Sequence, residues 1–359
     1  MRAAVMERHG GPEALLVRDD VDVPSAGDGQ VLVGVRAAGV NNTDIWTREG
    51  AYGSPADPDA VAGWLGVPLD TPRIQGADIA GVVQQVGPGV DERWVGCRVL
   101  VDPAFYSDES PDADVVALLG SERDGGFAEA VVVDAEQVHD VSGSPLSDAE
   151  LACLPIAYGT AAGMLRRGRA APGECVVVTG ASGGVGVALV QLAAASGLRV
   201  VALSTRDKAA QLIALGADSV VDRHSGALTD DLVAAAPAGI DLVADVVGGD
   251  LFSIWPGVTS RRGRIVVAGA IAGPVVTLDL RPLYLQQRQI IGSTMHTRRD
   301  FAALAERARR GEVSPPIAAR FDLREIHAAQ QAMRSGSSIG KVVIDRMRDQ
   351  GPPMPVRTG

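Results

Sequence analysis

The sequence of 359 residues has few cysteines and fewer basic than acidic residues, and each shortage excludes a class of structure or partner. Its three cysteines, Cys97, Cys153 and Cys175, are far apart and form no C-x-x-C pair, which argues against a disulfide framework or a zinc knuckle. The only lysines are Lys208 and Lys341, and the formal net charge is -11. We therefore expect no nucleic-acid partner, because phosphate contacts require a basic surface.

Long apolar runs are also missing. No segment reaches the ~18 consecutive apolar residues of a membrane helix, and residues 1–16 lack the basic start and apolar block of a signal peptide. We therefore expect a cytoplasmic protein that is not bound to a membrane. With 46% hydrophobic and 21% charged residues, the composition is that of a globular protein, and the length favours two domains.

The pattern of apolar residues along the chain changes near residue 147. Before it, "QVLVGVRAAGV" and "CRVLVD" indicate a β-rich region. After it, six short apolar runs alternate with stretches of helical spacing, which is typical of a parallel sheet covered on both faces. These runs are "CVVVTG", "RVVALS", "SVVD", "DLVADVVGG", "RIVVAGA" and "QIIGSTM". Residues 148–296 are thus predicted to form a doubly wound α/β domain with a six-stranded sheet.

The end of the chain is predicted to return to the first domain. "RRDFAALAERARRGEV" and "LREIHAAQQAMRSG" have the spacing of amphipathic helices, and "GKVVID" has that of a strand. Residues 1–147 and 297–359 would then form one domain, with a disordered tail at about 347–359. A ligand is expected in the cleft between the two domains.

The glycine cluster "VVVTGASGGVGVALV" predicts a dinucleotide site. Ala181, Gly183 and Gly186 stand at the three small positions of the fingerprint, where a chain turns after a strand and begins a helix that faces a pyrophosphate. Ser182, Gly183, Gly184, Val185 and Gly186 are the expected contacts in this turn.

Two other interpretations of this cluster concern different enzymes. "TGASGGVG" also fits the turn of the short-chain dehydrogenases, but these need a tyrosine four residues before a lysine, and Tyr284 precedes Arg288 instead. "GASGG" formally fits the nucleophile elbow of the α/β-hydrolases, with Ser182 as nucleophile and Asp245 with His296 or His327 as partners. Both remain open at this point, but about 175 residues precede the glycine turn where the short-chain family has few, and the polar end of the following strand, "ALSTRDK", has no role in a hydrolase.

That following strand ends in Ser204, Thr205 and Arg206, with Lys208 shortly after. NAD-binding folds place a carboxylate at such a strand end to bind the ribose hydroxyls. Here Ser204, Arg206 and Lys208 can instead donate hydrogen bonds to a 2'-phosphate, so we predict NADPH rather than NADH as the cofactor. The alternative is that Arg206 and Lys208 only solvate a helix start.

Over residues 1–346 the chain resembles the medium-chain dehydrogenase/reductase superfamily, in "AAGVNNTD", "QGADIAGVVQQVGPGV", "GFAEAVVV", "LPIAYGTAAG", "ALGAD" and "GKVVID" as well as in the glycine cluster. The resemblance implies a GroES-like catalytic domain and a Rossmann domain. Zinc-dependent members carry ligands at positions where this chain has Asn41, Ala77 and Ile156, and their structural zinc lobe is replaced by a cysteine-free acidic loop. No metal is therefore expected, and the chain is similar to the zinc-free quinone oxidoreductase branch.

This resemblance implies roles for the residues of "GVNNTDIW". Asn41 would lie near the nicotinamide ribose, Asp44 would hold the loop, and Trp46 would stack beside the acceptor. Asp44 could equally be a turn-forming carboxylate without ligand contact. Without a Lewis acid, reduction of a quinone or an α,β-unsaturated carbonyl is easier than oxidation of an alcohol. The expected set of cofactor contacts is completed by Asn41, Thr160, Arg223, Gly269, Ala270 and Met295.

The remaining expectations concern substrate and assembly. Residues 54–72 are longer than a compact relative needs and could form a lid in which Tyr52 and Trp64 shape the pocket. Alternative functions are an enoyl-thioester reductase that docks an acyl carrier on the arginines between 298 and 310, and a non-catalytic nucleotide-binding protein. His296 could donate a proton or be a helix-start residue without a catalytic task. A homodimer through "QIIGSTM" and a small-molecule substrate are expected.

Overall fold

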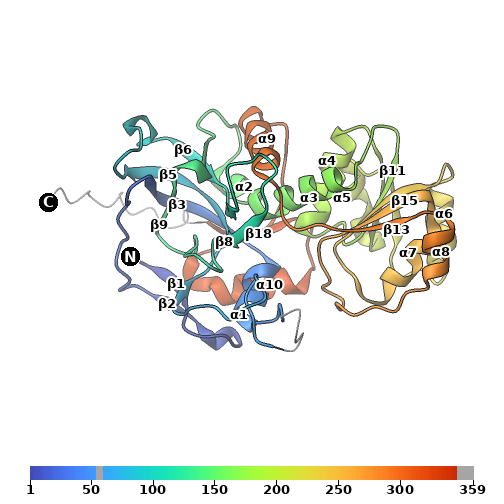
Figure 1. Ribbon diagram of the computed structural model, residues 1–359, viewed down its shortest axis with the longest axis horizontal. Helices are drawn as coiled ribbons and strands as arrows, with labels where there is room; N and C mark the ends of the chain where they lie inside the picture. Colours follow the sequence, from blue (N-terminus) through green and yellow to red (C-terminus); the bar gives the residue numbers. More distant parts are fainter. Residues whose placement is uncertain (54–59, 346–359) are drawn as a thin grey trace.

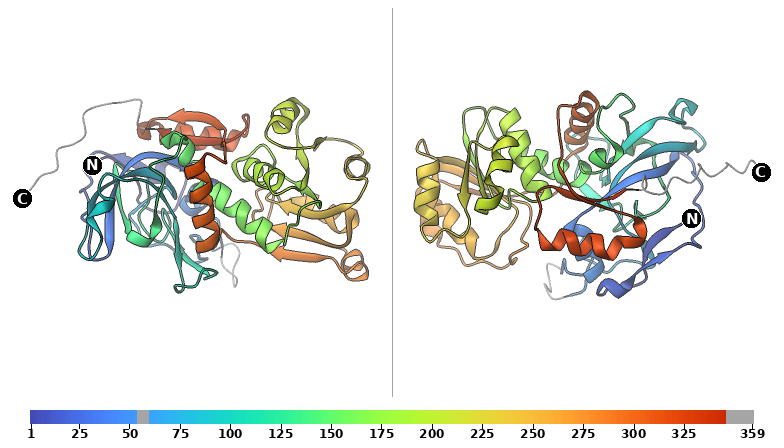
Figure 2. Two further views of the ribbon diagram at one scale, coloured as in Figure 1. Left: turned by 90° about the horizontal axis from the view of Figure 1, so that it is seen from above. Right: turned by 180° about the vertical axis from the view of Figure 1, so that it is seen from behind.

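The computed structural model describes residues 1–53 and 60–345, which form two lobes (Figure 1). The β-rich lobe contains the N-terminal part of the chain and its last strands, and the parallel-sheet lobe contains the middle. Helix α3 (Pro155–Arg167) lies at the junction in each view (Figures 1 and 2). The predicted two-domain α/β fold, with a GroES-like domain and a Rossmann domain, is confirmed.

A seven-stranded sheet is the centre of the β-rich lobe. Its order is β10-β6-β5-β3-β18-β17, and β9 pairs with the long strand β3. Alternating residues of β3, such as Val31, Val33 and Val35, are buried in the core of this lobe. The strands are β3 (Gln30–Val40), β5 (Asp78–Val86), β6 (Arg98–Val101), β9 (Ala130–Asp134), β10 (Val138–Asp140), β17 (Ile317–Phe321) and β18 (Lys341–Asp345).

Two small sheets and three helices complete this lobe. Helix α1 follows β3 directly, α2 packs on β3 and β5, and α10 packs on β17 and β18. The strands are β1 (Ala3–Met6), β2 (Leu15–Arg18), β4 (Arg73–Ile74), β7 (Ala104–Tyr106) and β8 (Val115–Leu118), and the helices are α1 (Asn42–Glu49), α2 (Asp148–Leu151) and α10 (Ile326–Ser335).

The parallel-sheet lobe has six strands in the order β13-β12-β11-β14-β15-β16, all parallel. The chain order reverses beside β11, so the strand ends around β11 and β14 form the crevice in which such folds bind ligands. The strands are β11 (Cys175–Val178), β12 (Arg199–Ser204), β13 (Ser219–Asp222), β14 (Ile240–Asp245), β15 (Thr259–Val267) and β16 (Gln289–Gly292), one for each predicted run.

Both faces of this sheet are covered, which explains why its strands are almost entirely apolar. Val176 and Val178 of β11 belong to the core beneath α3 and α4, whereas Val177 belongs to the core beneath α6 and α7. The helices are α4 (Gly184–Ala195), α5 (Ala209–Ala214), α6 (Leu228–Ala235), α7 (Trp255–Val258) and α8 (Leu280–Leu285). Helix α9 (Arg298–Arg310) packs on α3 and on β10 of the β-rich lobe.

The C-terminal segment returns to the first lobe as predicted. β18 pairs antiparallel with the end of β3, where Val342 lies opposite Val40, and it pairs parallel with β17. Lys341, the first residue of β18, therefore lies beside the start of α1. The predicted tail at 347–359 falls outside the described residues. Among the helices that are described, none is long and apolar enough to cross a membrane.

Candidate active site

The segment that contains Asn41 forms the junction between β3 and α1. Asn41 has an extended backbone and caps α1, and its amide N–H donates to Oδ2 of Asp44 at 2.7 Å. Asp44 thereby satisfies one backbone donor at the helix start, and the Asn41 side chain remains available for other contacts. The helix ends at Gly50, whose φ of 68° suits glycine.

A buried polar network connects Asn41 to the last strand. Oδ2 of Asp78 accepts hydrogen bonds from Nδ2 of Asn41 at 2.9 Å and from Nζ of Lys341 at 2.7 Å. Its Oδ1 accepts from the backbone N–H of Ile156 at 2.7 Å. Lys341 also donates to Val40 O at 3.1 Å and to Oδ1 of Asn41. Because Asp78 and Lys341 expose only 0% and 6% of their side chains, this is a desolvated ion pair between strands far apart in the sequence.

Burial raises the pKa of Asp44 from 3.8 to about 7, while hydrogen bonds from the Asn41 and Ala77 backbones and the charge of Lys341 oppose the shift. The folded pKa lies above the unfolded one. The protonated form therefore contributes stability that is fully present below pH 3.8 and is lost as the pH rises through about 7.

Replacing Asp44 by Asn tests this shift. Relative to the wild type, the free energy of unfolding of Asp44→Asn should increase by about 2–3 kcal/mol between pH 5 and pH 8, measured by urea unfolding at both pH values. Asp279→Asn is the control, since the pKa of Asp279 is about 2 and its carboxyl does not titrate in this window. A flat difference for Asp44→Asn would show that its carboxyl has an ordinary pKa.

An apolar wall faces this network. Ala77, Leu118, Ile156 and Met295 pack together, and Trp64 and Val115 pack against them. Ala77 precedes Asp78 in the chain, and the backbone N–H of Ile156 donates to Asp78. Both residues therefore lie next to the buried polar network. Met295, whose backbone has a φ of 48°, reaches the wall from the segment after β16. We call these six residues the apolar wall.

Two aromatic residues, Trp46 of α1 and Tyr52 shortly after it, contact each other. The rings of Trp46 and Tyr52 meet edge to face at 5.5 Å, and the Tyr52 hydroxyl is 2.5 Å from Oγ1 of Thr43. Burial raises the pKa of Tyr52, so the phenol stays protonated and can donate a hydrogen bond. Of the predicted lid, residues 54–59 lie outside the described part of the chain, and Trp64 joins the apolar wall.

The glycine loop has the shape that its sequence predicts. Gly180 has a φ of 54°, and the N–H of Gly183 donates to its carbonyl at 2.9 Å. A Cβ on Gly186 would lie 2.1 Å from Gly180 O, so only glycine fits there. A Cβ on Gly183 would meet only Gly180 O at 3.4 Å, which leaves open space at the start of α4. This is a cradle that fits the pyrophosphate of a dinucleotide.

The loop also touches the buried network. A Cβ on Gly184 would lie 2.7 Å from Cδ of Lys341, so the lysine stem passes directly beside the loop. Ser182 is 3.4 Å from Nζ of Lys208, and Val185 packs against the adjacent core. Thr160 is largely buried on α3, one turn after Ile156 of the apolar wall.

The far end of the expected cofactor site contains a carboxylate that the sequence did not place there. Asp222 ends β13, directly opposite Ser204 of β12, and its Oδ2 accepts from Nε of Arg206 at 2.8 Å. The side chain of Arg206 is 84% exposed. Arg223 follows Asp222 and contacts His224 at 3.1 Å. The ends of two neighbouring strands thus carry the predicted 2'-phosphate donors Ser204, Arg206, Lys208 and Arg223. The carboxylate of Asp222 lies at the same strand ends.

Gly269 and Ala270 follow the end of β15, two strands from the glycine loop. A Cβ on Gly269 would lie 2.9 Å from Val246 O, so the segment after β15 packs closely against the segment after β14. With Met295 after β16, most of the predicted cofactor residues lie at the carboxyl ends of β11, β12, β13, β15 and β16, whereas Asn41 follows β3 and Thr160 lies on α3.

The hydrolase interpretation is wrong. Asp245 is buried and binds Thr179 at 2.8 Å and Nε1 of Trp255 at 2.9 Å, with no histidine beside it. His296 is bound instead to Asp102, from Nε2 to Oδ1 at 2.9 Å. Among the described residues neither His296 nor His327 forms a hydrogen bond with Ser182 or Asp245, so the three groups of a triad are not brought together. The short-chain interpretation is excluded by the two-lobe fold, and Tyr284 lies 64% exposed on α8.

The structure bears on two further expectations. His296 is 0% exposed and its ring lies 4.9 Å from that of Phe301, which favours the interpretation of His296 as a helix-start residue without a catalytic task over that of a proton donor. The arginines proposed to dock an acyl carrier are largely paired with carboxylates, which removes most of their free positive charge. The pairs are Arg298–Glu136, Arg299–Asp112, Arg309–Glu306 and Arg310–Glu306. Asp112 belongs to the acidic loop, which is thus docked on α9 and not merely solvated.

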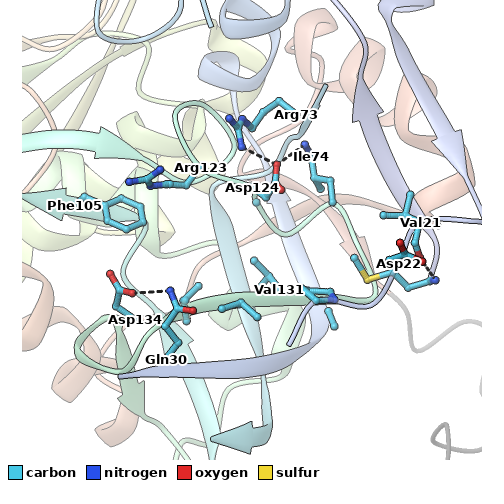
Figure 3. A pocket seen from close by; sticks show the side chains of 16 residues that line it. Val21, Asp22, Gln30, Arg73, Ile74, Phe105, Arg123, Asp124, Val131 and Asp134 are labelled. Carbon is cyan, nitrogen blue, oxygen red and sulfur yellow. Dashed lines mark hydrogen bonds and ion pairs between the residues drawn. The ribbon is translucent and has the colours of Figure 1, made fainter. Parts of the chain in front are cut away.

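A separate cavity of about 470 Å³ lies in the β-rich lobe (Figure 3). The Arg123 guanidinium lies over the Phe105 ring at 5.9 Å, and Arg73 pairs with Asp124 at 3.0 Å. No predicted site residue lines this cavity, so it is not part of the candidate site.

A β-rich lobe and a parallel-sheet lobe that carries a glycine loop define a two-domain oxidoreductase fold. Known proteins share this fold. Residues 27–143 match the family described as alcohol dehydrogenase GroES-like domain, and residues 184–310 match zinc-binding dehydrogenase. Quinone oxidoreductase of Mus musculus is 30% identical over 357 residues, which cover 96% of this chain and 97% of that protein. Acryloyl-coenzyme A reductase of Metallosphaera sedula is 29% identical over 359 residues, which cover 96% and 99%.

Among solved structures, a protein of Sinorhizobium meliloti 1021 described as an alcohol dehydrogenase has a TM-score of 0.93 at 43% identity, and the match covers 96% of each chain. The chain belongs to the medium-chain dehydrogenase/reductase superfamily, whose members are oxidoreductases.

The residues at the expected zinc positions do not fit a catalytic zinc ion. Ala77 and Ile156 have no donor atoms in their side chains, and the Asn41 amide is engaged by Asp78 and Lys341. Within residues 1–53 and 60–345, no three His, Cys, Asp or Glu side chains are grouped so that they could hold a metal.

Sequence reasoning missed Lys341, Asp78 and Asp222. Lys341 could have been noticed as one of only two lysines, at the start of a strand that returns to the first domain. Asp78 was considered only as a missing zinc ligand. Nothing in the sequence places Asp222 beside Ser204, because that contact depends on the pairing of β12 with β13.

Proposed function

We propose that this protein is an NADPH-dependent reductase that transfers a hydride to a quinone or an α,β-unsaturated carbonyl compound without zinc. The observation that carries the proposal is the apolar wall, in which Ala77 and Ile156 stand at two of the positions where zinc-dependent members of the superfamily carry ligands. We propose residues 148–296 as the cofactor domain and residues 1–147 with 297–359 as the catalytic domain. The quinone oxidoreductase relative supports this reaction.

The bound cofactor would supply the hydride, and the protein would supply position and polarity. The glycine cradle fixes the pyrophosphate, and the apolar wall gives the planar acceptor a dry surface against which it can be aligned. Asn41 is held by Asp78 and Lys341 at the edge of this space. We propose the hydroxyls of Thr43 and Tyr52, which contact each other, as donors that could bind an acceptor oxygen. For a quinone, one hydride and one proton complete the reduction, and the proton can come from water.

The test measures oxidation of NADPH with 9,10-phenanthrenequinone, with crotonyl-CoA and without any acceptor. Turnover with 9,10-phenanthrenequinone supports the proposal, and turnover with crotonyl-CoA alone supports an enoyl-thioester reductase, which the acryloyl-coenzyme A reductase relative favours. Binding of NADPH without turnover of either would indicate a non-catalytic protein. Stoichiometric zinc in the active protein, measured by elemental analysis, would contradict the zinc-free mechanism.

The preference for NADPH is tested at the paired residues Arg206 and Asp222. Arg206→Ala should raise the KM for NADPH about tenfold and leave the KM for NADH nearly unchanged. The reason is that Arg206 would form a charge-assisted hydrogen bond with the 2'-phosphate, a group that NADH lacks. Asp222→Asn should lower the KM for NADPH, because it removes a carboxylate that competes with the phosphate for Arg206. An equal effect of Arg206→Ala on both coenzymes would refute the assignment.

We also propose a homodimer that forms through the edge of the parallel sheet. Within the described part of the chain β16 pairs with β15 alone, and large apolar side chains are exposed around it. Between Ile271 and Ile290 these are Ile271, Val275, Val276, Leu280, Tyr284, Leu285 and Ile290. Ile290→Lys should shift the protein to monomer mass in gel filtration. Val233→Lys, at an apolar residue of α6 that is 52% exposed, should not. A monomeric wild type would contradict the proposal.

A further inference from the structure

Lys208 connects the two lobes beside the glycine loop. Its Nζ donates to Gly336 O at 2.7 Å and to Oγ of Ser182 at 3.4 Å. Gly336 follows α10 in the β-rich lobe, whereas Ser182 belongs to the glycine loop of the parallel-sheet lobe. One ammonium group therefore touches both the expected phosphate site and the opposite lobe.

The segment that receives this contact is a strap of five residues, 336–340, across the glycine loop. Its two end glycines, Gly336 and Gly340, have φ values of 58° and 101°. The N–H of Gly340 donates to Ser182 O at 3.1 Å, and a Cβ on Gly340 would lie 2.1 Å from Pro316 O. Ile339 packs against the core shared by the lobes. The 336–340 strap is thus held against the glycine loop at both ends.

Next to Lys208 there is room for a ligand group. A cavity of about 590 Å³ is lined by Lys208 and Gln211 from one lobe and by Ser337 and Ser338 from the other. The carboxylate in it, Asp207, accepts a hydrogen bond from the Thr205 side chain. A phosphate in this cavity would meet an ammonium group and two serine side chains of the strap.

We propose that Lys208 makes the 336–340 strap part of the 2'-phosphate site, an inference that rests on the proposed preference for NADPH. An ammonium has three hydrogens to donate, and Gly336 O and Ser182 Oγ account for two. The 2'-phosphate accepts the third and fixes the ammonium, which in turn fixes Gly336. NADH has no group to do this. Lys208 is then a specificity-determining residue whose effect extends to the opposite lobe.

Hydrogen exchange of the full chain tests this coupling. At saturating coenzyme, the strap amides, Gly340 included, should exchange at least about fivefold more slowly with NADP⁺ than with NAD⁺, as an added charge-assisted hydrogen bond would cause. Lys208→Met, which keeps the stem and removes the charge, should abolish this difference. Arg206→Ala is the matched control, because it acts on the same phosphate without touching the strap. It should bind NADP⁺ more weakly and keep the difference at saturation.

Equal exchange with the two coenzymes, faster exchange with NADP⁺, or an unchanged difference in Lys208→Met would each overturn the coupling. Calorimetry on the same samples separates this result from the coenzyme preference. If NADP⁺ binds more weakly than NAD⁺ but still protects the strap, the preference fails and the coupling stands. If NADP⁺ binds more tightly and protects nothing, the preference stands and the coupling fails.

Discussion

Lys341→Met should lower the free energy of unfolding by about 3–5 kcal/mol, the usual cost of removing one partner from a buried ion pair. The substitution keeps the apolar stem beside Gly184 and removes only the ammonium. Asp78, with 0% of its side chain exposed, would then keep a charge without a counter-ion. Asn41 would lose a donor at the candidate site, so kcat/KM should fall as well. Urea unfolding and steady-state kinetics measure the two effects.

The second lysine of the chain is the matched control. Lys208→Met removes a partly exposed ammonium that forms no ion pair within residues 1–53 and 60–345, so its cost should stay within about 1 kcal/mol. Asp78→Asn in the Lys341→Met background should restore part of the lost stability, because it removes the unpaired charge. If Lys341→Met costs no more than Lys208→Met, the buried network does not stabilise the fold.

We expect Gly183→Ala to weaken dinucleotide binding without affecting stability, and Gly186→Ala to lower stability. Gly183 has a φ of -78°, and an added Cβ meets nothing closer than 3.4 Å, so the variant should fold normally. That Cβ would occupy the space where the pyrophosphate approaches the backbone. Dinucleotide affinity in calorimetry should therefore fall by about tenfold to a hundredfold while the thermal midpoint stays nearly unchanged.

Gly186→Ala should instead destabilise the protein, because its Cβ would lie 2.1 Å from Gly180 O and 2.6 Å from Cα of Ala181. Backbone atoms would have to move, which costs about 1–3 kcal/mol for overpacking of this kind. A thermal midpoint that falls for Gly183→Ala, or an unchanged dinucleotide affinity in that variant, would show that the open space is not the phosphate cradle.

Much of the fold could be predicted because its signals are local. Each of the six apolar runs became one parallel strand, since a strand buried on both faces needs apolar residues at nearly every position. The glycine turn was equally readable, because the close approach at Gly186 excludes every side chain. The roles of Asn41, Asp44 and Trp46 were only implied, and they remain proposals.

The sequence by itself determined the two-lobe architecture, the glycine cradle and the lack of donor atoms at Ala77 and Ile156, because residue type and short-range spacing decide these features. Only the tertiary structure decided that Lys341 pairs with Asp78, that Asp222 binds Arg206, and that His296 is buried against Asp102. These pairs join residues between 16 and 263 positions apart. Strand order and register bring such residues together, so the paired side chains become neighbours only in the folded sheets.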